Sequence, residues 1–487
     1  MTLVLVSNRV ARPKANEPIN GGLAAALLPA VTASGAIWVG SSGKFIDSSE
    51  KREPFAEIEA LGTGALATVD LPAAQYRGFY QGFANSVLWP VLHSRTDLIR
   101  IGADDYASYC EINSIMARAL LRFAKPDAMF WIHDYHYMTL AADLRRLGIE
   151  QPVGFFLHTP FPTRHTLVSL PHHRELIQAM LAYDLIGFQT DEDRANFFDY
   201  VVHELRLTMR GDAVMSERGT TRLATFPIGI DAPAFADRAA RSINRAEVAR
   251  LRASLLGARL VIGVDRLDYS KGLDARFRAF DLALRNDPAL KRTVRLLQIA
   301  TLSRSEIATY RQLQGELAAL VGDINGRHGE VDWTPIRYLN RGFGQGILAG
   351  FFRTARVGLV TPLRDGMNLV AKEYVAAQDP ADPGVLVLSQ FAGAAKQLDA
   401  ALLVNPHDVG AIARAISVAV AMPLEERLKR WTAMMKVLEE SSLTHWFTSY
   451  VAALKATGHS ARTHERGNVA WPAFRRLQIE PAASPAY

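Results

Sequence analysis

The chain has 487 residues, 49% hydrophobic and 21% charged, which predicts two to three globular domains and excludes a mainly disordered, a collagen-like and a multi-span membrane protein. The single cysteine, Cys110, excludes an internal disulfide framework and a cysteine-based metal cluster, and it fits a reducing cytoplasm. The 55 basic and 49 acidic residues give a net charge of +6 without a dense basic block, so we expect small phosphorylated ligands and no nucleic acid.

The amino-terminal region raises the question of a membrane segment. Its first apolar run is short and Arg9 follows at once, which is not the pattern of a secretory signal. Residues 18–43 carry no charge and could cross a bilayer of about 30 Å, but they contain prolines, glycines and hydroxyl side chains. We therefore expect no membrane span. We expect a buried helix over residues 23–28 that ends or kinks before Pro29, and a short strand over 36–39.

Short β-branched runs alternate with longer helical patterns along the rest of the chain. Most of these runs are hydrophobic on both faces, which is typical of parallel strands covered by helices on both sides. Right-handed crossovers between such strands give doubly wound α/β sheets. The predicted strands cover residues 3–7, 129–132, 153–157, 185–189, 260–264, 294–300, 357–361 and 385–389.

These strands exceed what one sheet needs, so we divide the chain into two domains. The boundary follows residues 226–231, which we expect to form a strand that ends in a turn, and a charged helix over 239–255 comes next. We predict two Rossmann-like α/β domains that face a cleft. The proposed division is 1–232 for the first domain, 233–440 for the second, a terminal helix over 441–457 that packs back on the first domain, and a loose tail over 458–487.

Ligands of open α/β sheets bind beyond the carboxyl ends of the strands, so the turns there are the candidate sites. Gly21 and Gly22 precede a helix, where they form either a plain loop or an approach for an anion to the free N–H groups. The cluster of His133, Asp134 and His136 contains metal-binding residue types. Its spacing does not match a helical His pair and no cysteine assists, so we expect Asp134 to accept hydrogen bonds from sugar hydroxyls.

The next strand ends at His158, in a turn that two prolines stiffen. In the second half, Arg266 and Lys271 follow a strand five residues apart. They suit a pyrophosphate, with the guanidinium as a fork and the ammonium as a point charge; the alternative is a salt-bridged surface turn with Asp265 and Asp268.

Three more candidates follow later strands. Arg304 is another cation at a strand end, and Asp365 could accept sugar hydroxyls beside backbone N–H groups of residues 367–370. Glu373 could bind two ribose hydroxyls, or it could be a solvated helix residue paired with a cation. The chain lacks the Walker P-loop, the nucleophile elbow and the dinucleotide glycine motif. These residues therefore predict a two-domain enzyme that binds a phosphorylated, hydroxyl-rich ligand.

Taken in order, several of these segments resemble the trehalose-6-phosphate synthase family of retaining glycosyltransferases with the GT-B fold. The resemblance covers about residues 3–455 and rests on segments 6–9, 85–90, 131–136, 154–162, 265–272, 361–373, 384–394 and 404–406. It implies transfer of glucose, with retention, from a nucleotide-glucose to glucose 6-phosphate. Among nucleotide-glucoses, UDP-glucose is the expected donor. The products would be α,α-trehalose 6-phosphate and the nucleoside diphosphate.

The resemblance also implies a role for each matching residue. It implies catalytic roles for Asp134, His158, Arg266, Lys271 and Asp365. It places the acceptor at Arg9, Tyr80, Trp89, Asp134 and Arg304. It places the donor at Gly22, Arg266, Lys271, Asp365, Gly366, Met367, Asn368, Leu369, Val370 and Glu373. The resemblance thus assigns the acceptor to the first domain and the donor to the second. It implies no metal and no other cofactor, and a cytoplasmic location. It is compatible with a homo-oligomer, either a dimer or a tetramer. It also implies that a separate phosphatase acts on the product.

One position departs from the family pattern. The family usually carries a tryptophan in the acceptor pocket where this chain has Ser41. Two alternatives therefore stay open beside the synthase: a transferase with another phosphorylated acceptor, such as glycerol 3-phosphate, and a non-catalytic sensor of sugar phosphates. The sequence does not identify the base of the donor nucleotide.

Overall fold

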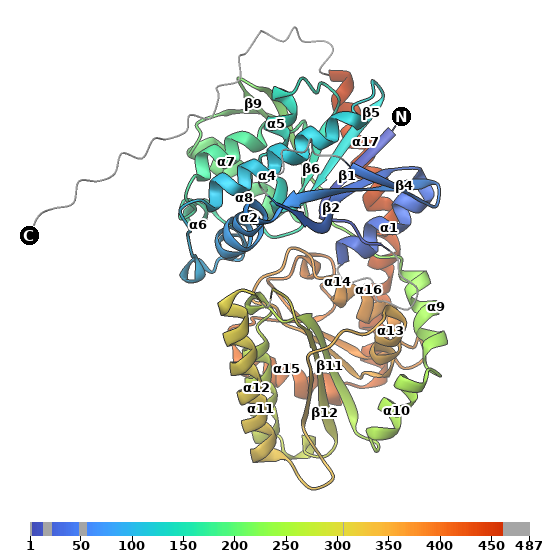
Figure 1. Ribbon diagram of the computed structural model, residues 1–487. Coiled ribbons are helices and arrows are strands. Elements are labelled where there is room, and N and C mark those ends of the chain that lie inside the picture. Colours follow the sequence, from blue (N-terminus) through green and yellow to red (C-terminus); the bar gives the residue numbers. More distant parts are fainter. Residues whose placement is uncertain (1, 13–21, 48–55, 305, 461–487) are drawn as a thin grey trace, which may run out of the picture.

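The computed structural model describes residues 2–12, 22–47, 56–304 and 306–460. It contains two β-sheets with helices on both faces, one in each half of the chain, stacked as an upper and a lower domain (Figure 1). The predicted α/β fold with two doubly wound domains is confirmed.

The first sheet has ten strands in the order β3-β4-β2-β1-β5-β6-β7-β10-β9-β8. Its strands from β4 to β10 in this order are parallel, whereas β3, β9 and β8 pair antiparallel at the two edges. The strands are β1 (Thr2–Arg9), β2 (Ile37–Ile46), β3 (Ala56–Leu61), β4 (Gly64–Pro72), β5 (Ala128–His133), β6 (Val153–Phe156), β7 (Leu185–Phe188), β8 (Thr208–Arg210), β9 (Ala213–Ser216) and β10 (Gly219–Thr225).

The helices of this half connect the strands and cover the sheet. They are α1 (Gly22–Ser34), α2 (Ala73–Tyr76), the π-helix η1 (Arg77–Leu88), α3 (Trp89–Leu92), η2 (Thr96–Leu98), α4 (Asp105–Leu120), η3 (Leu121–Phe123), η4 (Tyr135–Tyr137), α5 (Leu140–Arg146), α6 (Arg164–Leu167), α7 (His173–Met180) and α8 (Asp191–His203).

The second sheet has six strands, all parallel, in the order β13-β12-β11-β14-β15-β16. The strands are β11 (Arg259–Arg266), β12 (Val294–Thr301), β13 (Ile336–Leu339), β14 (Val357–Val360), β15 (Val385–Ser389) and β16 (Leu402–Val404). The helices are α9 (Ala232–Ser242), α10 (Ala246–Ser254), η5 (Tyr269–Lys271), α11 (Leu273–Asn286), η6 (Pro288–Leu290), α12 (Ala308–His328), α13 (Gln345–Thr354), α14 (Leu369–Ala377), η7 (Gly393–Lys396), α15 (Val409–Ala421) and α16 (Leu424–Glu440).

Strands that are hydrophobic on both faces form the centre of both sheets, because each face packs against helices. In β1, Val4 and Val6 belong to one core cluster and Leu5 belongs to another. The second cluster continues from Trp131 in the first domain to Phe351 in the second. The two domains therefore share one continuous hydrophobic core on that side.

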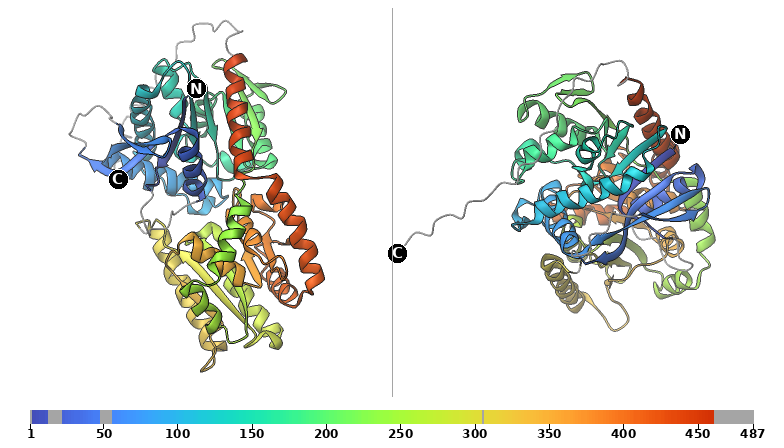
Figure 2. Two further views of the ribbon diagram at one scale, coloured as in Figure 1. Left: turned by 90° about the vertical axis from the view of Figure 1, so that its right-hand side faces the viewer. Right: turned by 45° about the horizontal axis from the view of Figure 1, so that its top comes forward.

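The last helix, α17 (Leu443–Ser460), lies along the first domain, whereas α16 lies along the second (Figure 2). The ring of Tyr450 stacks on Trp131 with 4.1 Å between ring centroids, and its hydroxyl donates to the Phe155 carbonyl at 3.0 Å. A Cβ atom at Gly187 would come within 2.8 Å of the Tyr450 ring, so this strand needs glycine to admit the helix.

Three expectations about local structure were wrong. The helix expected over residues 23–28 does not end before Pro29 and continues as α1 to Ser34. Proline removes one backbone donor, but Leu27 and Val31 on either side of it are fully buried, and this packing holds the helix together. The helix expected over 239–255 is two helices, α9 and α10. The first begins early, because the Asp231 carboxylate accepts the Ala234 N–H at 3.0 Å and caps it.

The strand nearest to residues 226–231 ends earlier, at Thr225; the Phe226 N–H still donates to the Phe188 carbonyl of β7 at 2.8 Å, and residues 227–231 belong to no strand. The backbone of this segment is instead satisfied from both domains. Gln189 accepts the Ile228 N–H at 3.0 Å, Lys372 donates to the Ile228 carbonyl at 2.6 Å, and the Ile230 carbonyl accepts the Leu443 N–H at 3.3 Å. The segment is therefore a fixed crossing between the domains.

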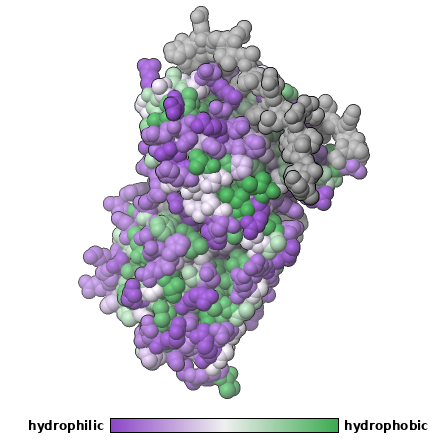
Figure 3. Space-filling model, turned by 90° about the vertical axis from the view of Figure 1, so that its left-hand side faces the viewer, coloured by the Kyte–Doolittle hydropathy of each residue, from purple (hydrophilic) through white to green (hydrophobic). Residues whose placement is uncertain are grey.

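No helix in the described ranges is long and apolar enough to cross a membrane. One face of the molecule shows hydrophilic side chains interspersed with smaller hydrophobic patches (Figure 3).

Candidate functional site

The turns after the strands of the two sheets meet between the domains. Trp89 of the first domain donates its indole N–H to Asp268 of the second at 3.4 Å, and Arg304 donates to the Tyr135 hydroxyl at 3.1 Å. Gly366 lies so close to the His158 carbonyl that a Cβ atom would overlap it. The candidate residues of both halves therefore belong to one site.

Arg304 is at the centre of the contacts between the domains. Its guanidinium donates to Asp268 at 3.0 Å and to the Tyr310 hydroxyl at 2.5 Å, and it lies 4.0 Å from the centroid of the Trp89 ring. Only 4% of the side chain is exposed. The guanidinium is therefore fixed in direction, as the recognition of a phosphate requires.

Asp268 is the functional residue that sequence reasoning missed. It is fully buried, and although burial raises its pKa, the charges of Arg304 and Arg266 bring the pKa to about 2. The alternative of a salt-bridged surface turn is wrong, because Asp265 is also buried and pairs with buried Arg276. The clue lay in the spacing: a third charged residue lies between Arg266 and Lys271 in a turn with little room for solvent.

The part of the site in the first domain, where the acceptor is expected, is built on a π-helix. In η1, the side chains of Asn85 and Ser86 donate to carbonyls five residues earlier, at 2.7 and 2.6 Å. Asn85 also accepts the Tyr135 hydroxyl at 2.9 Å, so the π-helix positions the tyrosine that contacts Arg304. The hydrogen-bonding pattern of a π-helix leaves no recognisable sequence signal, and π-helical turns are frequent at functional sites.

Two predicted acceptor residues lie at the edge of this half. Arg9 ends β1 and is exposed, and its charge interacts with Tyr76 and Tyr80. The Tyr80 ring stacks between the rings of Tyr76 and His136, with centroids 5.4 and 5.9 Å away. Ser41 stands beside Arg9 in the β1–β2 register, is buried, and accepts the Gly43 N–H at 3.2 Å.

Asp134 has a strained backbone. Its φ of 75° lies in the region that favours glycine, and its carboxylate accepts the His158 N–H at 3.2 Å. Burial raises the pKa of Asp134 to about 6, although N–H groups and the charges of Arg266 and Arg304 oppose the rise. Strained residues persist where the surrounding structure over-determines them, which is typical of functional sites.

His158 is held by two side chains. Its Nε2 lies 3.1 Å from Nδ1 of His133, and its Nδ1 lies 3.5 Å from the amide of Gln189. Burial lowers the pKa of His158 to about 3, so the ring is neutral at physiological pH. His136 packs against Phe79 and Tyr80 instead. Among the residues that the structure describes, no group of three or more His, Cys, Asp or Glu side chains has the arrangement of a metal site.

The part of the site in the second domain, where the donor is expected, contains the predicted cations. Lys271 forms an ion pair with Asp365, and Asn368 donates its side-chain amide to the same carboxylate at 3.0 Å. Burial raises the pKa of Asp365, but the charge and hydrogen bond of Lys271 outweigh it and hold the pKa below its usual value. Arg266 is exposed and lies 5.3 Å from the centroid of the Trp89 ring, so its guanidinium faces the contact between the domains.

The remaining donor candidates surround the start of α14. Asn368 has a φ of 74° and caps the helix by accepting the Ala371 N–H at 3.3 Å; it follows buried Met367 and precedes Leu369 and Val370 in the first turn. A helix start presents free N–H groups and a positive dipole end to an anion. Gly22 is the first residue of α1, and Gly21 lies outside the described residues.

Glu373 is one turn further along α14. Burial raises its pKa to about 7, and hydrogen bonding to Gln345 and the charge of Arg238 oppose the rise. A solvated helix position would not show such a shift, so the expected alternative of an exposed ion pair does not fit. The neighbouring Lys372 has a structural role, because its ammonium donates to the Ile228 carbonyl and to Gln397 at 2.7 Å.

Comparison with known proteins places this site in a family. Residues 7–456 match the model of glycosyltransferase family 20. A trehalose-6-phosphate synthase of Sinorhizobium fredii is 45% identical over 458 residues, which are 93% of this chain and 98% of the relative.

Two solved structures are similar along the whole domain pair. A UDP-forming α,α-trehalose-phosphate synthase from Burkholderia xenovorans, in complex with glucose 6-phosphate, matches with a TM-score of 0.90 and 42% identity, over 93% of this chain and 100% of that chain. The trehalose-6-phosphate protein of E. coli bound with UDP-2-fluoro glucose matches with a TM-score of 0.88 and 40% identity, over 93% and 99%.

Proposed function

The chain belongs to glycosyltransferase family 20, and on this basis we propose that it transfers glucose from UDP-glucose to glucose 6-phosphate with retention. The products are α,α-trehalose 6-phosphate and UDP. The observation that carries the proposal is the contact of Trp89, Arg304 and Asp268 between the domains, beside Arg266. This contact places Arg304, a fixed cation for the acceptor phosphate, next to Arg266, a cation for the donor diphosphate.

On the donor side, Arg266 and Lys271 neutralise the diphosphate. Lys271 uses one of its three N–H donors on Asp365, so two remain for phosphate oxygens. The backbone N–H groups from Gly366 to Val370 and the start of α1 at Gly22 supply further donors. Asp365 holds glucose hydroxyls, and Glu373 accepts from the ribose.

On the acceptor side, Arg9, Tyr80 and Arg304 hold the 6-phosphate, while Trp89 and Asp134 surround the sugar. Asp134 orients the acceptor hydroxyls, and neutral His158 lies beside the donor glucose. The neutral ring brings no charge into the reacting centre.

The reaction breaks the bond between the anomeric carbon and the diphosphate. Negative charge grows on the leaving oxygen, where Arg266, Lys271 and the helix N–H groups stabilise it most. The acceptor hydroxyl attacks from the face that the diphosphate leaves, and its proton passes to the leaving phosphate oxygen. Closure of the two domains around the substrates excludes water, which would otherwise hydrolyse the donor.

A product assay tests this function. The purified protein is incubated with UDP-, ADP- or GDP-glucose and a panel of sugar phosphates that includes glycerol 3-phosphate. We expect NMR and mass spectra to identify a 1,1-linked α,α-disaccharide phosphate from UDP-glucose and glucose 6-phosphate. Donor binding without turnover of any pair would contradict the proposal and favour a sensor.

Ser41 favours a second candidate, a transferase with a different phosphorylated acceptor. A small residue next to Arg9 leaves the acceptor side less enclosed than a tryptophan would. Product from another acceptor alone would support this candidate. In that case, Ser41→Trp is the first substitution to make, with the acceptor panel as the measurement.

A further inference from the structure

A groove of about 590 Å³ runs along β13, the edge strand of the second sheet. Helices α10 and α13 form one wall and strands β12 and β13 form the other. Leu251, Leu297 and Phe351 give the groove an apolar floor. This shape and size suit a small organic molecule.

The groove is rich in cations. Arg250, Arg295, Arg337 and Arg341 line it, against the carboxylates of Glu247 and Asp332. The Asp332 carboxylate is already paired with Arg292 at 2.6 Å. The groove therefore carries an excess of positive charge within a small volume.

Arg295 is the most unusual of these cations, because only 6% of it is exposed. Its Nη2 donates to the Asp332 carbonyl at 3.3 Å, but its buried Nε has no hydrogen-bond partner in the described ranges. Buried guanidinium groups are ordinarily paired and fully hydrogen-bonded, because an unpaired charge is costly to bury. In the part of the chain that the structure describes, no carboxylate forms an ion pair with Arg295.

Arg337 comes next to Arg295 on the neighbouring strand. Its guanidinium donates to the Ser254 hydroxyl at 2.6 Å and to the Ser254 carbonyl at 3.0 Å, both neutral acceptors. Burial and the charge of Arg295 lower the pKa of Arg337. Among the described residues, these two neighbouring cations donate to neutral acceptors and form no ion pair, which suits an anion site.

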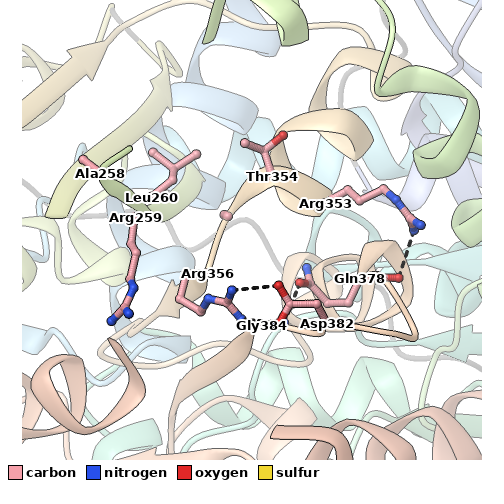
Figure 4. A pocket seen from close by; sticks show the side chains of 10 residues that line it. Ala258, Arg259, Leu260, Arg353, Thr354, Arg356, Gln378, Asp382 and Gly384 are labelled. Atoms are coloured by element: carbon pink, nitrogen blue, oxygen red, sulfur yellow. Dashed lines mark hydrogen bonds and ion pairs between the residues drawn. The ribbon is translucent and has the colours of Figure 1, made fainter. Parts of the chain in front are cut away.

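A second arginine-rich cavity shows what a purely structural network looks like (Figure 4). It measures about 220 Å³ and is lined by Arg259, Arg353 and Arg356. There Arg356 makes two hydrogen bonds with the Asp382 carboxylate, at 2.9 and 3.0 Å, and Arg353 pairs with Asp379 at 3.2 Å. Arg353 and Arg356 are neutralised by carboxylates and Arg259 donates to the Val420 carbonyl, whereas neither Arg295 nor Arg337 of the groove forms an ion pair among the described residues.

We propose that the groove binds a phosphorylated small molecule, with its phosphate on Arg250, Arg295 and Arg337 and its apolar part on Leu251, Leu297 and Phe351. The site is separate from the proposed transferase site. Arg295 is the second residue of β12, about 20 Å along the strand from the end that leads to Arg304. The proposal does not depend on the transferase activity.

Titration calorimetry of the full chain tests it, with inorganic pyrophosphate as the probe. Two titrations are run, one with UDP and glucose 6-phosphate present to occupy the donor and acceptor sites and one without them, because either ligand could itself enter the groove. We expect one further saturable site for pyrophosphate. We expect its affinity to fall at least tenfold in Arg250→Glu, which changes an exposed side chain, and in Arg295→Met.

The matched control is Arg278→Glu, an equal charge change at an exposed position of α11, which packs on the opposite face of the sheet. It should bind pyrophosphate as the unmodified chain does. Thermal melting checks that each variant is folded, and Arg250→Glu keeps the test valid if Arg295→Met unfolds. Absence of a further site, or equal affinity in Arg250→Glu and Arg278→Glu, would overturn the proposal.

Discussion

Asp268 carries a buried negative charge, and the position of Arg304 depends on it. Each is nearly or fully inaccessible to solvent, and they lie 3.0 Å apart. Removing one partner of such a pair leaves the other as an uncompensated buried charge. In the proposed reaction, Arg304 binds the acceptor phosphate, so a change at Asp268 is expected to affect the acceptor before the donor.

Asp268→Asn keeps the shape of the side chain and removes its charge. We expect the KM for glucose 6-phosphate to rise about 10- to 100-fold, as for the loss of a hydrogen bond between charged groups, and the KM for UDP-glucose to change less. Steady-state kinetics with each substrate varied gives both values. Asp237→Asn, in an exposed ion pair on α9, is the control. Equal changes in both KM values would contradict a role in positioning Arg304.

The strained backbone of Asp134 gives a test that uses two substitutions. At a φ of 75°, glycine is unstrained and alanine is not, so Asp134→Gly should be more stable than Asp134→Ala by about 1–3 kcal/mol. Both should lose most of the activity, because both lack the carboxylate. Urea unfolding compares their stabilities. The control is Asp143, within helix α5. There the alanine variant should be more stable than the glycine variant by about 1 kcal/mol. The same order at both positions would contradict strain at Asp134.

Among the elements, the π-helix η1 offers a matched pair of side chains. Asn85 and Ser86 each donate to a carbonyl five residues earlier, but only Asn85 also accepts from Tyr135. We expect Asn85→Ala to weaken glucose 6-phosphate binding about tenfold and Ser86→Ala to leave it nearly unchanged. Calorimetric titration with glucose 6-phosphate measures both. Equal weakening would mean that the helix as a whole, and not the Tyr135 contact, matters.

Helix α14 carries Glu373, whose pKa is raised to about 7 by burial. The folded state therefore favours the protonated form, so stability is full below the ordinary pKa of about 4.5 and is lost as pH rises through about 7. Glu373→Gln removes this loss. We expect it to raise the free energy of unfolding by about 1–3 kcal/mol at pH 8, with little effect at pH 4.

The same substitution should weaken UDP binding, because a carboxylate accepts from two ribose hydroxyls better than an amide does. Urea unfolding at the two pH values and a UDP titration at pH 8 measure both effects. A variant that is less stable than the unmodified chain at pH 8 would contradict a buried, destabilising carboxylate.

The sequence predicted the elements that hydrophobic burial determines. Eight of the expected strands are present within two residues, because strands hydrophobic on both faces stand out in the sequence, whereas the strand expected over 36–39 extends to Ile46 and that over 226–231 is absent. The sequence did not predict β3, β4, β8, β9, β10, β13, β16 or η1. Edge strands such as β3 and β13 bury less hydrophobic surface than central strands do, and a π-helix has the composition of an α-helix.

The same limit applies to the site. Strand ends pointed to Asp134, Arg266 and Asp365, but not to Asp268 or Asn85. These two residues act through side chains from distant parts of the chain, 36 residues away for Asp268 with Arg304 and 50 for Asn85 with Tyr135. Their roles depend on tertiary contacts, which no local pattern reveals.

At the scale of the whole molecule, the chain crosses between the domains twice, and the two crossings touch. Gly229 in the first crossing lies against the Ser441 carbonyl in the second, and a Cβ atom on Gly229 would overlap that carbonyl. On the side of the site, Gly366 lies against the His158 carbonyl in the same way. Glycine therefore sets the separation of the domains at both places.

Gly366→Ala would test how closely the domains must approach. The added methyl group would overlap the His158 carbonyl oxygen, so the domains must move apart or the turn must shift by about 1 Å. The donor groups on α14 would then be displaced from Asp134 and His158. Because misplacement of reacting groups by about 1 Å can cost 100-fold in rate, we expect kcat to fall by about 10- to 100-fold.

Gly315→Ala is the matched control, because nothing lies within 4 Å of an added Cβ atom there, on helix α12. It should leave kcat unchanged and stabilise the helix by up to about 1 kcal/mol. Steady-state kinetics and urea unfolding of both variants measure the contrast. A fall in kcat for Gly366→Ala alone would tie the reaction to the distance between the domains. Unchanged kcat in both would mean that the turn at Gly366 can yield, and that the donor groups do not depend on close approach to His158.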